Sequence, residues 1–348
     1  MKAAVLESYN NFVWKDVETP KVKPGEVLCR IKFASICGTD MHIFPGDFHP
    51  RTPVPFIPGH EMGGVVEEVG EGVSGFQPGD KVAIDPIIWC NECPACKRKH
   101  YPACINLKLL GVDMDGGFAE YVVAQPHMLF KAAQELPDEH VALTEIYGIG
   151  FHANSRAETK EGDVLAIWGA GRVGQVILQA ARTKTSGTIF MIDPLDNRLE
   201  IAEKHNKNVI GINPKKENPV EAIKRHTNGN GVDIAFEAVG HAEEIKGVFT
   251  PIRSCIQSLR GGGKVCVLGL SDHPAAIVFK ELIWKEAQII TSRVSDGEFT
   301  EVIEHLNAGN LKPDALISKV MHGSQIQEAF ELVQKEKEKY LKVLLDFS

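Results

Sequence analysis

A glycine-rich turn between two apolar runs constrains the fold of this 348-residue chain more than any other feature. Residues 164–168 form a short apolar run, as in strands that are buried on both faces. The hexapeptide 169–174 follows, with glycine at its first, third and sixth positions, and residues 175–182 have a helical pattern. A second apolar run, 188–192, ends at Asp193. This order of features predicts a dinucleotide-binding βαβ unit, whereas a glycine turn that serves packing alone is the alternative.

The glycines have separate roles in the predicted cofactor site. Gly169 permits the tight turn, Gly171 lets the backbone approach the pyrophosphate, and Gly174 allows the helix to pack closely on the strand. The helix N-terminus supplies amides and partial positive charge to the phosphates. The predicted cofactor contacts are Gly169, Gly171, Val173, Gly174, Asp193, Arg198, Leu268, Gly269 and Leu270.

Asp193 predicts which dinucleotide binds. Its carboxylate can accept hydrogen bonds from the adenosine ribose hydroxyls and would repel a 2′-phosphate, which favours NAD over NADP. Arg198 is the nearby cation that leaves some use of NADP open.

The rest of the chain indicates two domains, which its length also favours. Strand-like runs at 232–236 and 264–268 continue the alternation with helical patterns, so a parallel sheet with helices on both faces is expected. Before residue 160, β-like runs such as 27–33 and 63–70 are broken by glycine and proline. The predicted fold class is therefore α/β, with a mainly β domain beside a doubly wound parallel sheet.

Four cysteines crowd into a short segment with the spacing C-x2-C-x2-C-x7-C. Steps of this length place thiolates around one tetrahedral ion, and four sulfurs leave no open coordination position. A structural zinc is therefore predicted, with an iron–sulfur cluster as the alternative that four cysteines also allow. The ligands are Cys90, Cys93, Cys96 and Cys104, whereas Cys29, Cys255 and Cys266 lie in apolar runs and are expected in the core. Trp284 is expected to be a packing residue and not part of a substrate site.

Composition excludes several classes of partner. The chain has 38 Lys and Arg against 46 Asp and Glu, a net charge of −8, which argues against binding to nucleic acid. No apolar stretch is long enough to span a membrane, and the N-terminus turns polar too soon for a secretory leader. A cytoplasmic protein is expected, and clustered cysteines there are more often metal ligands than disulfides.

A second group of candidate ligands is dispersed. It begins with Cys37 and continues at His60 and Glu61, which together offer a thiolate, an imidazole and a carboxylate. These are ligands of the kind that catalytic zinc uses.

At this point the chain resembles the medium-chain zinc-dependent alcohol dehydrogenases over essentially its whole length. The resemblance rests on Gly59-His60-Glu61 with Gly64 and Gly70, the cysteine quartet, the turn 76–82, the segment 116–121 and the glycine fingerprint, all in that family's order. It implies a GroES-like mainly β catalytic domain (1–148 plus 290–348) carrying both zinc ions. A Rossmann NAD-binding domain (149–289) is inserted, with the active site in the cleft.

The resemblance also implies the catalytic ligand set. Cys37, His60 and Glu61 form the zinc shell, and Glu145 is a direct, exchanging or water-mediated ligand. Glu145 stands where classical members carry a second cysteine, which resembles the sorbitol and threonine dehydrogenase branches. Ile146 departs from the proline that usually follows this glutamate.

A proton route is implied as well. Thr39 resembles the family's relay hydroxyl and His42 its relay histidine, and Asp40 resembles the carboxylate that orients the ligand histidine. In this mechanism the zinc is the Lewis acid, and hydride passes from the substrate alcohol to the nicotinamide.

The expected activity is oxidation of a secondary alcohol of a polyol to a ketone or ketose with NAD. L-Threonine 3-dehydrogenase is the runner-up, but its relatives usually carry tryptophans between residues 43 and 58, where this chain has none. A non-catalytic or zinc-free relative is the alternative of another class. Relatives of both branches are commonly tetramers, so a homotetramer is expected and a dimer is the alternative.

Overall fold

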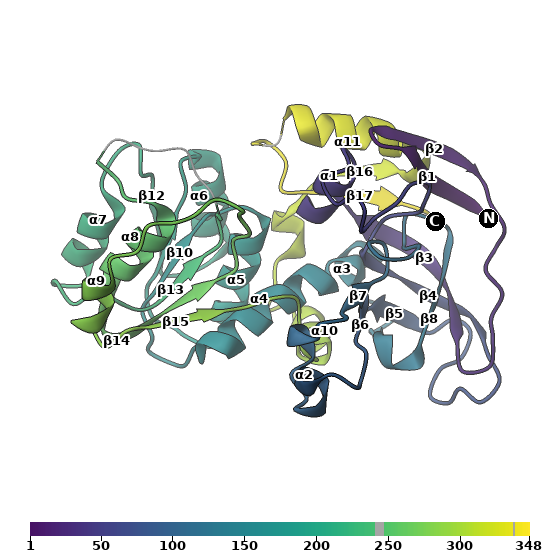
Figure 1. Cartoon of the computed structure of the whole chain (residues 1–348), viewed down its shortest axis with the longest axis horizontal. Helices are drawn as coiled ribbons and strands as arrows, with labels where there is room; N and C mark the ends of the chain where they lie inside the picture. The colour runs from purple at the N-terminus through teal and green to yellow at the C-terminus, as the bar shows by residue number, and fades with distance from the viewer. Residues whose placement is uncertain (241–246, 337) are drawn as a thin grey trace. The chain divides into compact units, whose positions relative to one another are not determined.

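The computed structural model describes residues 1–240, 247–336 and 338–348 (Figure 1). The chain divides into two compact units, the first made of residues 1–146 and 296–348 and the second of residues 147–295. The first unit is therefore discontinuous in sequence, because the second is inserted into it.

The first unit is built on a mainly antiparallel sheet of seven strands. The order is β16-β17-β3-β4-β5-β9, and β8 pairs with β3. The C-terminal strand β17 thus lies beside β3, although more than 300 residues separate them. The strands are β3 (Val27–Ser35), β4 (Glu61–Val69), β5 (Lys81–Ile84), β8 (Tyr121–Ala124), β9 (Leu129–Lys131), β16 (Ile317–His322) and β17 (Lys342–Asp346).

Two small two-stranded sheets and several helices complete this unit. The sheets are β1 (Lys2–Ser8) with β2 (Asn11–Asp16) and β6 (Ile87–Ile88) with β7 (Lys108–Leu109). The helices are α1 (Gly38–Ile43), α2 (Pro94–Lys97), α3 (Asp138–Ala142), α10 (Phe299–Asn307) and α11 (Ile326–Lys335), and α4 (Thr144–Ala157) leads into the second unit. Phe118 and Phe330 are fully buried in its core.

The second unit is a parallel six-stranded sheet of order β12-β11-β10-β13-β14-β15. This is the doubly wound order, in which the chain reverses direction next to its first strand. The strands are β10 (Leu165–Trp168), β11 (Ile189–Ile192), β12 (Val209–Ile212), β13 (Val232–Glu237), β14 (Leu259–Val267) and β15 (Gln288–Thr291). The helices are α5 (Arg172–Arg182), α6 (Asp196–His205), α7 (Pro219–His226), α8 (Pro251–Ser258) and α9 (Phe279–Ile283).

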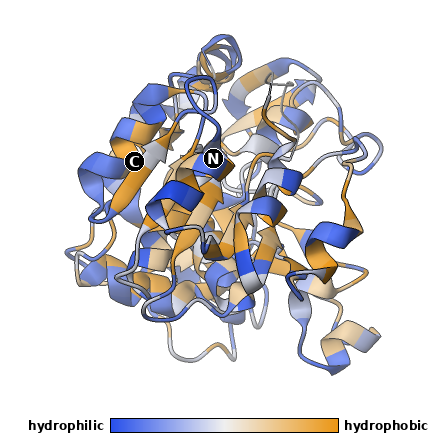
Figure 2. Ribbon diagram, turned by 90° about the vertical axis from the view of Figure 1, so that its left-hand side faces the viewer, coloured by the Kyte–Doolittle hydropathy of each residue, from blue (hydrophilic) through white to orange (hydrophobic). Residues whose placement is uncertain are grey.

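Alternate residues of β10 explain why its sequence is apolar throughout. Leu165 and Ile167 pack into one core cluster, whereas Ala166 and Trp168 pack into another on the opposite face. Both faces of the strand are thus covered by helices, so no position needs a polar side chain. In Figure 2 the strands are mostly orange, whereas the helices alternate orange and blue.

The predicted fold class is confirmed. Cys29, Cys255 and Cys266 are buried, as expected, but Trp284 is 76% exposed in the single chain and does not belong to a core. Within the described residues, no helix is long and apolar enough to cross a membrane.

Candidate active site and cofactor site

Three predicted catalytic ligands meet in the first unit. Cys37 is the residue just before α1, and His60 and Glu61 lie at the start of β4. Ligand atoms of the three side chains all lie within 4.8 Å of one another. His60 and Glu61 are buried, and Cys37 is half-buried. The group therefore brings a thiolate, an imidazole and a carboxylate to one point inside the protein.

Asp40 connects the two segments that carry these ligands. Its Oδ2 accepts a hydrogen bond from the backbone N–H of Cys37 at 2.8 Å, and its Oδ1 lies 3.4 Å from Nδ1 of His60. A carboxylate on one ring nitrogen leaves the other nitrogen for a metal, which is a common arrangement around zinc. Burial alone would lower the pKa of His60, but the charges of Asp40 and Cys37 raise it well above its ordinary value.

Glu61 is held by a buried cation that the sequence analysis did not identify. Its Oε2 accepts hydrogen bonds from Nζ of Lys342 and from Oγ of Ser35. The side chains of both Lys342 and Glu61 are fully buried. Burial would raise the pKa of Glu61, but the charges of Lys342 and His60 lower it below its ordinary value.

Glu145 lies in the first turn of α4 and is 6% exposed. It is not a member of the group formed by Cys37, His60 and Glu61. Burial and the charge of Glu61 raise the pKa of Glu145 to about 8. The charge of Glu61 therefore acts on Glu145.

The chemistry of this group fits a metal ion. Two buried carboxylate atoms, Oε1 of Glu61 and Oε2 of Glu145, have no hydrogen-bond partner, whereas Oδ1 of Asp40 and Nδ1 of His60 lie 3.4 Å from each other. Buried polar atoms in proteins nearly always have partners, so the two carboxylate oxygens require an explanation. A zinc ion coordinated or approached by these side chains provides one.

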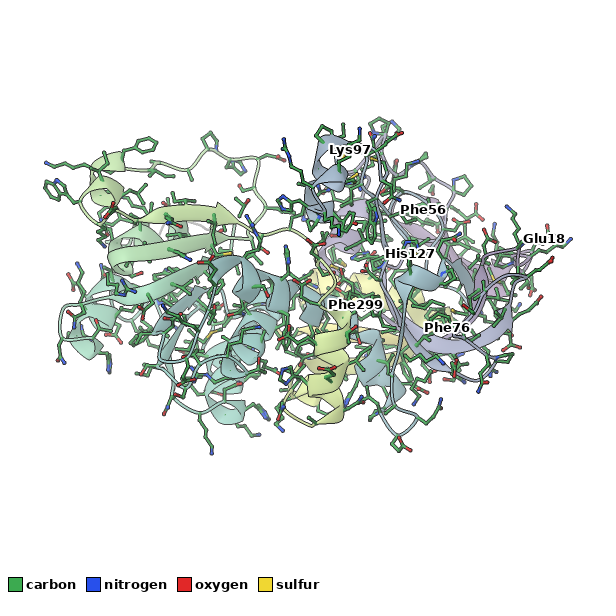
Figure 3. The ribbon with its side chains drawn as sticks, turned by 90° about the horizontal axis from the view of Figure 1, so that it is seen from below. Glu18, Phe56, Phe76, Lys97, His127 and Phe299 are labelled. Carbon is green, nitrogen blue, oxygen red and sulfur yellow. The ribbon has the colours of Figure 1, made fainter. Side chains whose placement is uncertain are left out.

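The cysteine quartet fits a second, closed metal site. Its four Sγ atoms all lie within 4.8 Å of one another, and three of the Sγ–Sγ distances are 3.5, 3.6 and 4.0 Å. A tetrahedron with zinc–sulfur bonds of about 2.3 Å has edges of about 3.8 Å. The cysteines are not bonded to one another as disulfides. Lys97 of α2 projects from this lobe, as Figure 3 shows.

In the second unit, the glycine fingerprint has the geometry of a phosphate cradle. Gly169 has a φ of +95°, and a Cβ at Gly174 would lie 1.7 Å from the carbonyl oxygen of Gly169. A Cβ at Gly171 would meet only Nη1 of Arg198, at 3.8 Å. The second glycine, which precedes α5, therefore faces open space that a phosphate can occupy.

Asp193 lies at the end of β11 and is 3% exposed. Its Oδ2 accepts from the backbone N–H of Ala170, and its Oδ1 accepts from that of Leu195. Nη1 of Arg198 lies 3.6 Å from Oδ2. The carboxylate thus joins the glycine turn to the start of α6, and Arg198 lies next to both Asp193 and Gly171.

Glu237, which the sequence analysis also missed, ties together two loops at the same edge of the sheet. Its Oε1 accepts hydrogen bonds from the backbone N–H groups of Val239 and Gly240. A Cβ at Gly269 would lie 2.4 Å from Oε2 of Glu237. The predicted cofactor segment 268–270 therefore packs against residues 238–240. Leu270, the last residue of this segment, is 92% exposed.

The two predicted relay residues lie on α1. Thr39 is half-buried, and the side chain of His42 is 66% exposed. Nδ1 of His42 lies 3.0 Å from Oδ2 of Asp47, within hydrogen-bonding distance.

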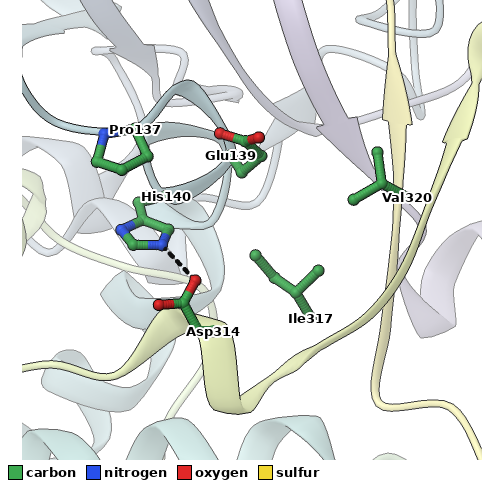
Figure 4. Close-up of a pocket in the computed structure, with 6 residues that line it drawn as sticks. All are labelled: Pro137, Glu139, His140, Asp314, Ile317 and Val320. Atoms are coloured by element: carbon green, nitrogen blue, oxygen red, sulfur yellow. Dashed lines mark hydrogen bonds and ion pairs between the residues drawn. The ribbon is translucent and has the colours of Figure 1, made fainter.

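A pocket elsewhere in the first unit contains another histidine–aspartate pair. Figure 4 shows His140 bonded through Nε2 to Oδ1 of Asp314 at 2.8 Å, with Pro137, Glu139, Ile317 and Val320 around them. None of these residues was predicted to have a functional role, and the pocket lacks the convergent ligands of the zinc group.

Replacing the buried Asp85 with asparagine is expected to raise the free energy of unfolding at pH 8 by about 2–4 kcal/mol. Burial raises the pKa of Asp85 from 3.8 to about 7; the N–H of Ile87 opposes this shift, and the charges of Glu298 and Asp296 add to it. Between about pH 4 and 7, the carboxyl group of Asp85 is therefore protonated in the folded chain but ionised in the unfolded chain. Stability falls as the pH rises through this window, and the full loss is present above it.

Urea unfolding of the wild type and of Asp85→Asn at pH 5.5 and 8.0 measures this effect. The gain should be larger at pH 8.0, because the asparagine amide cannot ionise but can still accept the Ile87 N–H bond. An equal gain in the free energy of unfolding at both pH values would contradict the raised pKa of Asp85.

Two family models match the chain. The alcohol dehydrogenase GroES-like domain matches residues 23–138, and the zinc-binding dehydrogenase model matches residues 173–308. A sorbitol dehydrogenase of Bacillus subtilis is 31% identical over 99% of this chain and 97% of its own length. The chain belongs to the medium-chain zinc-dependent alcohol dehydrogenases. An L-threonine 3-dehydrogenase of Pyrococcus horikoshii, 34% identical over 92% of both chains, is another member of this family to which it is similar.

Solved structures of dehydrogenases match the whole fold. A short chain alcohol dehydrogenase (rspB) of E. coli CFT073, complexed with NADH, has a TM-score of 0.89 and 27% identity over 99% of both chains. A zinc-binding dehydrogenase of Sinorhizobium meliloti 1021, bound to NADP, has a TM-score of 0.90 and 27% identity, over 99% of this chain and 98% of its own. The two dehydrogenases hold different dinucleotides, so the fold alone does not select the cofactor.

Proposed function

We propose that the chain is a zinc-dependent dehydrogenase that oxidises a secondary alcohol of a polyol to a ketone or ketose with NAD. The observation that carries the proposal is the meeting of Cys37, His60 and Glu61 at one buried point. The glycine cradle of the second unit supplies the complementary dinucleotide site. A non-catalytic relative would have no need for a buried group of unpaired ligand atoms.

In this proposal each unit has its own role. Cys37, His60 and Glu61 hold the catalytic zinc, Glu145 coordinates it directly, in exchange or through water, and the cysteine quartet holds a second zinc. The catalytic zinc supplies a Lewis acid that makes the substrate hydroxyl easier to deprotonate. Asp40 orients His60, and Lys342 holds Glu61 ionised. Thr39 and His42 carry the released proton to solvent, which the exposure of His42 permits.

The second unit orients the dinucleotide. Gly171 and the start of α5 receive the pyrophosphate, and Gly174 keeps the helix close to the strand. Asp193 would accept hydrogen bonds from the adenosine ribose hydroxyls, and Arg198, 3.6 Å from Asp193, would lie beside them. Val173 and the segment Leu268-Gly269-Leu270 complete the cofactor contacts. NAD is favoured because the buried Asp193 would repel a 2′-phosphate, and the proximity of Arg198 leaves slower use of NADP open.

A specific observation favours a second substrate. The L-threonine 3-dehydrogenase relative has a higher identity, 34%, than the sorbitol dehydrogenase relative, 31%, over a smaller share of the chain. Oxidation of the 3-hydroxyl of L-threonine is therefore the second candidate, and the same ligand group would serve it.

A screen of NAD reduction against polyols, L-threonine and 2,3-butanediol tests the proposed function. The expected result is turnover of at least one polyol, faster with NAD than with NADP and abolished by a zinc chelator. Faster turnover of threonine than of any polyol would make L-threonine the proposed substrate. Turnover that survives the chelator would contradict the zinc mechanism.

We also propose that the chain works in the cytoplasm as a homo-oligomer, a tetramer or otherwise a dimer, joined through α9 and β15. Phe279, Ile283 and Trp284 are 70, 72 and 76% exposed, and Ile289 of β15 is 40% exposed. β15 is also an edge strand of the described sheet, and edge strands with apolar neighbours are prone to pair with a second copy. The native mass measured by light scattering tests this, and a single-chain mass would contradict it.

A further inference from the structure

Asp47 contacts His42 twice. The backbone N–H of Asp47 donates to the carbonyl oxygen of His42 at 3.0 Å, and Oδ2 of Asp47 lies 3.0 Å from Nδ1 of the imidazole. From these contacts we propose that Asp47 is a positioning residue that holds His42 as the tautomer with a proton on Nδ1 and a lone pair on Nε2. The proposal rests on the proposed function, because it assigns His42 the relay role given above.

The loop that carries Asp47 is fixed to the body of the unit by Tyr9. Gly46 has a φ of +98° and lies so close to the Tyr9 ring that a Cβ would approach it to 2.9 Å. The hydroxyl of Tyr9 bonds with Nδ1 of His49 at 3.0 Å and donates to the carbonyl oxygen of Thr52 at 3.2 Å. The chain is thus held on both sides of Asp47.

Phe48 restrains the plane of the imidazole. Its ring lies nearly parallel to that of His42, at 24° and with 6.4 Å between ring centres. Phe48 itself packs against the core of the first unit. The stacked ring restrains the tilt of the imidazole, and the carboxylate selects which ring nitrogen points toward it.

The chemistry of the pair determines the tautomer. An ionised carboxylate can only accept a hydrogen bond, so Nδ1 of a neutral His42 must carry the proton. Nε2 is then the basic atom. It takes the proton that Thr39 passes on, which forms an imidazolium beside the Asp47 carboxylate, and it releases the same proton to water. The exposure of both partners, 66 and 57%, means that the pair contributes little to stability.

Selective 15N labelling of histidine in the full zinc-loaded chain tests the proposal through the ring nitrogen shifts of His42. In the wild type, the neutral form should carry its proton on Nδ1. In Asp47→Ala the Nε2-protonated form should appear, and kcat at low buffer concentration should fall about 3–10-fold. Added imidazole buffer should restore the rate. Asp47→Asn, whose amide oxygen can still accept from Nδ1, should retain more of the rate than the alanine variant.

Asp314→Ala is the matched control, because Asp314 bonds a different histidine, His140, at 2.8 Å (Figure 4). It should leave the His42 tautomer and the rate unchanged. If Asp47→Ala kept the wild-type tautomer and rate while His42→Ala was slow, His42 would still be a relay residue. Asp47 would then not position it, and the proposal would be overturned. If the His42 tautomer changed in Asp47→Ala but neither Asp47→Ala nor His42→Ala was slower than the wild type, Asp47 would position His42. The relay role of His42 in the proposed function would then be wrong.

Discussion

Replacing Lys342 with methionine is expected to lower the free energy of unfolding by about 3–5 kcal/mol. Lys342 and Glu61 are both fully buried, and the lysine is the cation bonded to that carboxylate. In the zinc-free chain, methionine fills a similar volume but leaves the charge of Glu61 without its lysine partner in the protein interior, where a poorly paired ion is unfavourable by several kcal/mol. Urea unfolding of the variant and the wild type, both freed of zinc by a chelator, measures the loss.

The double variant Glu61→Gln with Lys342→Met separates loss of the charge pair from loss of packing. Removing both charges should recover much of the stability, because the uncompensated ion is then absent. Lys339→Met is the control, since Lys339 forms an exposed ion pair with Glu336 and its removal should change stability by at most about 1 kcal/mol. A Lys342→Met chain as stable as this control would show that Glu61 needs no buried cation.

The strands of the second unit were predictable where the chain is apolar on both faces. The runs at 164–168 and 188–192 differ by a single residue from β10 and β11. By contrast, β12 contains a glycine, and β15 has only Ile289 and Ile290 between two polar residues. Both strands lie at the edges of the sheet, where one side is less covered, so their sequences lack a continuous apolar run.

The candidate site was predictable where the residue types themselves indicate chemistry. A cysteine quartet and a His-Glu pair suggest metals in any chain, and the structure brings Cys37 to His60 and Glu61. Lys342 was missed because a lysine that opens a strand is usually solvent-exposed. Its burial follows from pairing with a residue 281 positions away, and no local pattern carries that information. Glu237 was missed for a similar reason, because its partners are backbone amides.

Replacing Cys37 with serine is expected to lower the zinc content from two ions to one per chain and turnover by roughly three orders of magnitude. Serine keeps the shape of the side chain, but its hydroxyl is not ionised near neutral pH and is a far weaker zinc ligand than a thiolate. A factor of a thousand corresponds to about 4 kcal/mol of transition-state stabilisation, within what a Lewis acid contributes. Metal analysis and steady-state rates with the best substrate measure both effects.

Cys93→Ser is the matched comparison, because it also removes a thiolate but belongs to the closed quartet. Its zinc content should also fall to one ion. The main consequence, however, should be a lower unfolding temperature, since a four-sulfur site has no position for substrate. The buried contacts of His60 with Asp40 and of Glu61 with Lys342 remain in Cys37→Ser, so this variant should stay folded while it loses turnover. If Cys37→Ser kept two zinc ions and wild-type turnover, Cys37 would be excluded from the catalytic site.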